Sequence, residues 1–312
     1  MTKKSTALLF ASSPTFTFAL WVSIKSLFEK SPRLAEMSDV FVYAYNWPEE
    51  VKQFFMRSFP VTVLDYDLPD FVPRVQNLLT FTPALFARFE AFDLLTRYEK
   101  VICLDSDILI RKELAHVLED GTSAPGTVAL VKDRIPTVGQ NFFAPVEHYN
   151  MQAPCYNTGF LVLKNPLPAK EIHTWLYQMI AKHADITFLG DQGFINLMFQ
   201  QFPVSPVELP KTYNMPASRS KKSLDESFII HSSGPRKFWC YYYFHDWYES
   251  YAQYRRLGGV ALTVRKNTKA YDWLLTRLKF NRWVFWELAP DCFRYPAKFL
   301  RFCVKRLLRA KY

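Results

Sequence analysis

The sequence predicts an α/β fold with a mainly parallel central sheet, and three observations support this. Short runs of β-branched and aromatic residues alternate along the chain with stretches of helical periodicity. Prolines stand at two of the expected helix starts, where a missing N–H costs no hydrogen bond. The 312 residues are 49% hydrophobic and 22% charged, a composition typical of a globular protein with a large core.

The strands are expected in the first three quarters of the chain. Ser12, Ser13 and Pro14 interrupt the first apolar stretch, which favours a buried strand over a signal peptide. The expected strands span residues 7–11, 40–45, 61–65, 101–105, 127–131, 159–163 and 228–231.

The helices are expected between these strands, and Pro48 and Pro83 stand at the start of two of them. The expected helices span residues 16–29, 48–57, 83–98, 171–183 and 191–200. In open α/β sheets, ligands bind at the carboxyl ends of the strands. The residues that directly follow each strand are therefore the candidates for function.

The composition excludes several classes of protein. Nine glycines against twenty prolines disfavour a glycine-loop nucleotide binder. Five widely spaced cysteines without a CxxC motif disfavour a disulfide framework or a zinc ribbon and favour a reducing compartment. No run of 18 apolar residues occurs, so no transmembrane helix is expected. The net charge of +10 implies anionic partners.

Asp105 and Asp107 are the strongest candidates for a metal site. They follow the strand VICLD and are separated by Ser106. Oxygen ligands of this kind suit Mg²⁺ or Mn²⁺. Asp65 and Asp67 have the same spacing after another strand, but the proline-containing turn LDYDLPD favours solvated acids there.

A second candidate is the segment HSSGPRK, directly after the last strand. His231 is either a metal ligand or a structural hydrogen-bonding residue. Gly234 allows close approach of the backbone, and Lys237 is suited to a phosphate contact.

Three further candidates also have ordinary structural readings. Asp191, followed by Gln192, opens an expected helix and is by default a helix cap. Asn157 lies in a segment that reads as a turn, and Arg88 lies on a helix where a solvated arginine is the default.

Together these segments resemble the family-eight retaining glycosyltransferases, over about residues 6 to 240. The similarity rests on five pieces in order, which are YEKVICLDSD preceded by a helix with Arg88, then NTGFLVLKN, GDQGFINLMF, LPKTYNM and HSSGPRKFW. The resemblance implies a GT-A fold, a Rossmann-like nucleotide-diphospho-sugar transferase domain, which uses Mn²⁺ and a UDP-sugar donor. Mg²⁺ is the alternative metal.

The resemblance also implies roles for individual residues. Asp105, Asp107 and His231 correspond to the metal ligands. The nucleotide-sugar contacts correspond to Arg88, Ser106, Gly234 and Lys237, and the residues lining the donor sugar and the reaction centre to Asn157, Asp191 and Gln192.

The sequence departs from the family pattern after the first strand. The usual Asp and Asn that contact the uridine fall near Ser13 and Thr15, which can still form hydrogen bonds. The family's acidic residue downstream of the fifth strand has no clear counterpart here, and Asp133 is an unanchored candidate for it. The resemblance places the acceptor near residues 132–156, a long aromatic segment that reads equally as an acceptor loop and as a packed surface excursion.

The end of the chain differs from the rest, and we predict a catalytic domain over 1–250 and a basic, aromatic, helical segment over 251–312. Residues 271–312 hold ten Lys and Arg against three Asp and Glu. Residues 292–311 read as a basic amphipathic helix. Such a helix suits an anionic membrane surface, which predicts a cytoplasmic enzyme held peripherally on the inner face of a membrane.

The preferred function is therefore transfer of a hexosyl group, galactose or glucose, from a UDP-sugar to a saccharide or glycolipid acceptor. A catalytically silent sugar- or membrane-binding scaffold of the same fold is the alternative, although Asp105, Asp107, His231 and Lys237 are intact. A nucleic-acid-binding protein is disfavoured because the basic charge is concentrated near the C-terminus.

Overall fold

The computed structural model describes residues 4–72, 83–118, 126–187, 190–217, 219, 221–233, 237–241 and 244–260. The chain divides into two units. The first comprises residues 1–235 and 244–263, and the second comprises residues 236–243 and 264–312. Of the second unit, α8 (Phe238–Tyr241) is described. The predicted C-terminal segment lies largely outside the described residues, so the division at residue 250 stays a prediction.

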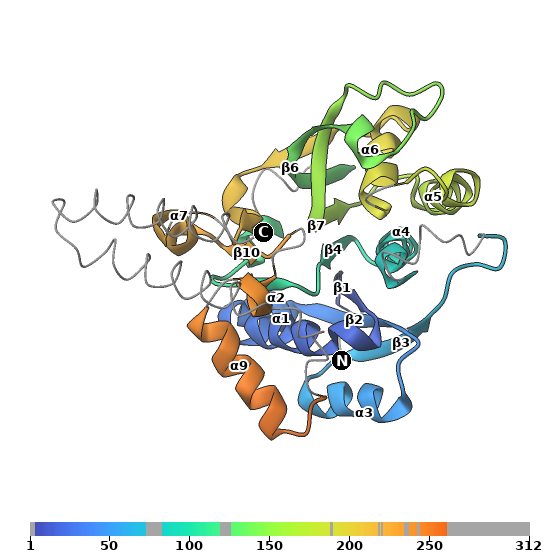
Figure 1. The fold of residues 1–312 in the computed structure, drawn as a ribbon. Helices are drawn as coiled ribbons and strands as arrows, with labels where there is room; N and C mark the ends of the chain where they lie inside the picture. The colour runs from blue at the N-terminus through green and yellow to red at the C-terminus, as the bar shows by residue number, and fades with distance from the viewer. Residues whose placement is uncertain are drawn as a thin grey trace, which may run out of the picture. The chain divides into compact units, whose positions relative to one another are not determined.

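A seven-stranded sheet forms the centre of the first unit, in the order β3-β2-β1-β4-β7-β6-β8 (Figure 1). The strands are β1 (Thr6–Ser12), β2 (Ser38–Tyr45), β3 (Thr62–Tyr66), β4 (Lys100–Leu104), β6 (Thr127–Thr137), β7 (Pro154–Lys164) and β8 (Pro206–Leu209). Strands β1 to β4 are parallel, and β8 is parallel to β6. Only β7 runs against its neighbours β4 and β6, so the predicted mainly parallel sheet is confirmed.

A second sheet of three short strands lies beyond the end of β4. It has the order β5-β10-β9, formed by β5 (Ile108–Ile110), β10 (Ile229–His231) and β9 (Met215–Pro216). Strand β10 is antiparallel to β5, and its register pairs His231 with Ile108. This pairing brings the end of β10 beside the turn that joins β4 to β5.

Helices cover both faces of the large sheet. Alternate residues of a strand face opposite sides. Ala7 and Leu9 of β1 belong to a core cluster that includes residues of α4 (Glu90–Leu95), α5 (Ala169–His183) and α6 (Asp191–Gln201). The intervening Leu8 and Phe10 are also fully buried, on the face that α1 (Thr17–Lys30) contacts. Figure 1 shows α9 (His245–Arg256) beside α1, where Trp21 packs on Tyr254.

The predicted elements are present with shifted ends, and the differences have physical reasons. Residues 83–98 form a 3₁₀ helix, η3 (Pro83–Phe89), followed by α4. Within the segment 132–156, β6 extends to Thr137 and β7 begins at Pro154, with η6 (Val138–Asn141) between them. The helix α3 (Glu49–Ser58) was expected, but α2 (Pro32–Met37) and α7 (Lys221–Glu226) are too short to show a periodicity.

Within the described residues, every helix is too short or too polar to cross a membrane.

Candidate functional site

The turn that carries Asp105 and Asp107 is held from three sides. The Ser23 hydroxyl of α1 lies 2.8 Å from the carbonyl oxygen of Ser106 and 2.7 Å from that of Ile108. The backbone N–H of Ser232 donates to the carbonyl of Asp107 over 3.1 Å. The N–H of Asp105 donates to the carbonyl of Gly159 on β7, so the turn cannot move independently of the two sheets.

Asp105, Asp107 and His231 converge on one point. Nε2 of His231 lies 3.2 Å from Oδ2 of Asp105 and 3.2 Å from Oδ1 of Asp107. One ligand atom from each residue falls within 4.8 Å of the others, and His231 and Asp107 are buried. Two carboxylates and an imidazole at this separation fit a hard divalent cation.

Gly159 lies against this cluster, and its lack of a side chain leaves room for His231 and Asp105. A Cβ at this position would lie 2.4 Å from Cε1 of His231 and 2.9 Å from Oδ2 of Asp105. The segment that reads as a turn is instead a bulge within β7, where the partner of Val131 jumps from the neighbourhood of Leu161 to Asn157. The bulge delivers Gly159 to the carboxyl end of β4.

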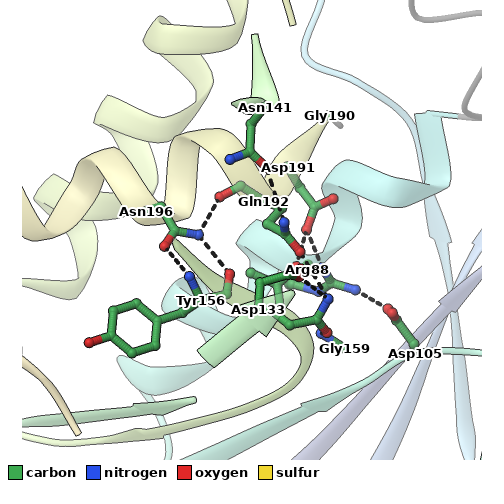
Figure 2. Close-up of polar contacts among 12 residues, drawn as sticks. Arg88, Asp105, Asp133, Asn141, Tyr156, Gly159, Gly190, Asp191, Gln192 and Asn196 are labelled. Atoms are coloured by element: carbon green, nitrogen blue, oxygen red, sulfur yellow. Dashed lines mark hydrogen bonds and ion pairs between the residues drawn. The ribbon is translucent and has the colours of Figure 1, made fainter. Parts of the chain in front are cut away.

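Arg88 is buried, so the default reading of a solvated helix residue is wrong. Its guanidinium bridges two acids, with one nitrogen on Asp105 and the other on Asp191, and it also donates to the hydroxyl of Thr158 (Figure 2). Two buried acids require a counter-charge, which this arginine provides. The bridge joins the metal cluster to the start of α6.

Asp191 does not cap α6 either. Gly190, with a φ of +61°, occupies the N-cap position, and the Asp191 carboxylate turns inward to accept from Thr158 over 3.1 Å. Burial raises the pKa of Asp191 to about 6, even though Arg88 lies beside it. Burial also opposes ionisation of Asp105, yet Arg88 and His231 hold the pKa of that carboxyl below its usual range.

The pKa of His231 shifts upward, whereas that of Asp105 shifts downward. Burial alone would lower the pKa of the imidazole, but the carboxylates of Asp107 and Asp105 raise it to about 9. The cluster thus combines two acids and a proton-accepting ring, and a metal ion would replace the proton between them.

A row of amides extends from the cluster toward α6. Asn157 donates to Oδ2 of Asp133 over 2.7 Å and to Oε1 of Gln192 over 3.1 Å. Figure 2 shows Gln192 reaching on to Asn141. Carboxylates and amides in one row can accept and donate hydrogen bonds, and they lie beside a site that fits a cation.

The sequence matches the model of glycosyl transferase family 8 over residues 7–242. The chain belongs to this family. Its members transfer sugars, so the polar row and the acid cluster belong to a glycosyltransferase. None of the curated protein sequences matches the chain.

Solved structures agree with this glycosyltransferase in fold. The bifunctional glycosyltransferase WbbM superposes with a TM-score of 0.61 and 16% identity over 81% of the chain, which spans only 50% of WbbM. The galactosyltransferase LgtC, solved with donor and acceptor sugar analogues, gives a TM-score of 0.58 and 16% identity, with 83% of this chain and 98% of LgtC covered. GlyE of Streptococcus pneumoniae TIGR4 gives 0.54 and 17% identity, with 90% and 64% covered. The predicted GT-A fold is confirmed.

Among the predicted nucleotide contacts of the glycosyltransferase, Ser13 and Thr15 follow β1. Their hydroxyl oxygens lie 3.0 Å apart, and Ser13 is buried. Ser106 lies in the turn between the two acids. Gly234 lies outside the described residues, and Lys237 belongs to the second unit, so their predicted roles stay predictions.

Sequence reasoning assigned no role to four residues that hold the site together. They are Ser23, Asn141, Asn214 and Ser232. Asn214 lies in the matched segment LPKTYNM, which is the one signal that pointed to it. Asp133, which the sequence left unanchored, is placed by its hydrogen bond from Asn157.

Proposed function

We propose that this enzyme transfers a hexosyl group, galactose or glucose, from a UDP-sugar to a saccharide or glycolipid acceptor, with retention of configuration at the anomeric carbon. The convergence of Asp105, Asp107 and His231 beside a row of sugar-orienting groups is the observation that carries this proposal.

The metal would be held by these three side chains, and Mn²⁺ or Mg²⁺ fits their donor atoms. When bound, the ion supplies Lewis-acid stabilisation to the diphosphate leaving group. Arg88 carries a buried positive charge between the metal cluster and the sugar side. The bond that breaks develops negative charge on the diphosphate, which such a charge stabilises in the transition state.

The nucleotide-sugar would be bound by Arg88, Ser13, Thr15, Ser106, Gly234 and Lys237. In this proposal Lys237 assists the departure of the diphosphate. Lys237→Ala should then lower kcat more than it raises the KM for the donor. A raised KM with unchanged kcat would show that Lys237 contributes only to ground-state binding.

Asp191, Gln192 and Asn157 would line the sugar and the reaction centre. The carboxylate of Asp191 is occupied by Arg88 and Thr158, an arrangement that favours orientation of sugar hydroxyls over attack on the anomeric carbon. The sugar becomes oxocarbenium-like as the bond to the diphosphate breaks. Polar groups held rigidly beside it need no reorganisation during that step.

The acceptor and the location of the enzyme rest on sequence alone. We place the acceptor near residues 132–156 and the enzyme in the cytoplasm, on the inner face of a membrane through its basic C-terminal segment. Sedimentation with anionic vesicles should retain the full-length protein and lose a variant that ends near residue 270. Equal partitioning of the two would exclude this segment as the anchor.

A hydrolysis screen across UDP-sugars with Mn²⁺ tests the proposed chemistry directly. Slow, Mn²⁺-dependent release of UDP from one sugar nucleotide identifies the donor. Asp107→Asn should abolish this release while the protein stays folded. Binding of UDP-sugars without any turnover by the wild-type enzyme, with or without acceptors, would instead support a catalytically silent scaffold.

A further inference from the structure

A chain of side-chain amides links the metal cluster to the reaction side of the enzyme. At the cluster, Nδ1 of His231 lies 2.7 Å from Oδ1 of Asn214. Asn214 Nδ2 donates to Oδ1 of Asn157 over 2.5 Å. Asn157 in turn donates to Oε1 of Gln192 over 3.1 Å. The metal ligand and the sugar-side glutamine are therefore three hydrogen bonds apart.

The same chain of amides continues past Gln192 and ends at a backbone carbonyl oxygen. Gln192 Nε2 donates to Oδ1 of Asn141 over 3.0 Å, as Figure 2 shows. Asn141 Nδ2 donates to the carbonyl oxygen of Val138 over 2.8 Å. Asn141 is fully buried, and Gln192 and Asn214 are nearly so.

The backbone carbonyl of Val138 fixes which amide donates and which accepts in each hydrogen bond of this chain of amides. A carbonyl oxygen only accepts, so Asn141 must present its NH₂ to Val138 and its oxygen to Gln192. Gln192 must then present its NH₂ to Asn141 and its oxygen to Asn157. The orientation of each amide thus follows from the one before it.

Asn157 is fixed independently at the middle of the chain. Its NH₂ faces the carboxylate of Asp133, which accepts, and its oxygen faces the backbone N–H of Gly159, which donates. Two donors and two acceptor positions are all that an asparagine amide has, and Asn157 uses both of each. The Asn157 amide therefore cannot flip without losing hydrogen bonds.

This direction determines the tautomer of His231. The Asn214 amide gives its NH₂ to Asn157, so it offers its oxygen to His231, and Nδ1 of the ring must carry a proton. The other ring nitrogen, Nε2, is the one that faces Asp105 and Asp107. Its lone pair is then the one available to a metal.

We propose that Asn214 is a positioning residue that holds His231 in its metal-binding tautomer and, by donating to Asn157, completes the hydrogen bonds that keep Asn157 against Oε1 of Gln192. This proposal rests on the proposed function. It makes metal affinity and turnover depend on Asn214 by two separable routes, because one atom of its amide serves His231 and the other serves Asn157.

Two variants separate these routes. Asn214→Leu removes both hydrogen bonds. Asn214→Asp keeps an acceptor for His231 but cannot donate to Asn157. In a calorimetric titration of the full-length protein with Mn²⁺ alone, Asn214→Leu should bind about 10-fold or more weakly, and Asn214→Asp should stay within about threefold of wild type. With saturating Mn²⁺ and donor, Asn214→Asp should lose about 10-fold or more in the kcat of donor hydrolysis, with a near-unchanged KM.

Gln53→Leu is the matched control, because Gln53 carries an exposed side-chain amide on α3 that takes no part in this chain of amides. It should keep wild-type Mn²⁺ affinity and kcat. Wild-type Mn²⁺ affinity in a folded Asn214→Leu would overturn the tautomer assignment, and wild-type kcat in Asn214→Asp would overturn the link to Gln192. If circular dichroism shows that Asn214→Leu is unfolded, a loss of Mn²⁺ affinity in folded Asn214→Asp overturns the assignment instead. Absence of Asp107-dependent Mn²⁺ binding in the wild-type protein would overturn the proposed metal site itself.

Discussion

Two acid pairs with the same spacing lie at the ends of two strands of one sheet, β3 and β4, and their surroundings differ completely. Asp65 lies one residue before the end of β3, its side chain is 77% exposed, and it pairs with Lys52 on α3 over 2.6 Å. Asp105 and Asp107 instead lie among Arg88, His231 and Gly159 at the end of β4. The same motif is a solvated surface pair in one place and part of the proposed metal site in the other.

The difference between the two acid pairs lies in the strands that flank β3 and β4. Among the described strands, β3 lies at the edge of the large sheet and pairs with β2 alone. Strand β4 is central, between β1 and β7, and β10 closes over its end. A pair of carboxylates at a central strand is desolvated, and burial then requires the counter-charges that the site supplies.

The largest expected effect comes from removing one acid of each pair. Asp107→Asn should lower donor hydrolysis at least about 1,000-fold, because the loss of a metal-held leaving group removes several kcal/mol of transition-state stabilisation. Asp65→Asn should keep wild-type turnover. Steady-state kinetics with Mn²⁺ measure both. Equal losses in the two variants would contradict the contrast between the pairs.

The next effect concerns the counter-charges. Arg88→Met leaves Asp105 and Asp191 buried without their common partner, which should cost about 3–5 kcal/mol of folding stability. Lys52→Met breaks an exposed pair and should leave the melting temperature unchanged. Thermal unfolding at pH 7 checks both variants.

The folding stability of the Arg88→Met variant should also depend on pH. The pKa of Asp191 is about 6 in the folded protein, above its ordinary value, so ionised Asp191 costs stability above that pH. Loss of Arg88 should raise this pKa further, and protonation of Asp191 then relieves the cost as the pH falls. The stability difference between Arg88→Met and wild type should be smaller at pH 5 than at pH 7. A difference that grows toward pH 5 would exclude this explanation.

Most of the fold and the acid pair Asp105 and Asp107 could be predicted from the sequence, because both rest on local patterns. Strands β1, β2 and β4 are continuous apolar runs, and Asp105 and Asp107 directly follow one of them. His231 could be assigned only through the resemblance, since more than 120 residues separate it from Asp107 in the chain and the antiparallel pairing of β10 with β5 brings them together.

The resemblance named Arg88 and Asp191 as site residues, but their contacts could not be predicted, because these depend on burial rather than on pattern. Arg88 and Asp191 have ordinary surface readings on their own helices, and only the packing of η3 against α6 makes them partners. Strands β5 and β9, with three and two residues, are too short to show an alternation, so Asn214 beside β9 gave no local signal. Tertiary contacts override local preference at these positions.

A smaller effect is expected from a substitution at Gly159, which lies against His231 and Asp105. Gly159→Ala places a methyl group 2.4 Å from Cε1 of His231. The ring must shift away from the two acids, and Mn²⁺ affinity should fall about 10- to 100-fold, as it does when a ligand is misplaced. Gly258→Ala is the control, since a Cβ there meets nothing within 4 Å although its φ of +95° makes the change strained. Calorimetric titration should show Mn²⁺ affinity reduced in Gly159→Ala alone.

The smallest expected effect concerns the support of the turn by α1. Ser23→Ala removes the hydroxyl that bridges the carbonyls of Ser106 and Ile108, and Ser26→Ala removes a hydroxyl one turn along the same helix that accepts from the N–H of Ile110. Both losses should lower stability by about 1–3 kcal/mol, because each leaves a buried polar group of the backbone without its partner. Only Ser23 touches the turn between the two acids, so only Ser23→Ala should also weaken Mn²⁺ binding, by about threefold to tenfold. Matched titrations and melting curves of the two variants separate these effects. If both variants bind Mn²⁺ like wild type, Ser232 and Gly159 hold the turn without α1, and the contrast between the two acid pairs then depends on β7 and β10 rather than on the helix beneath them.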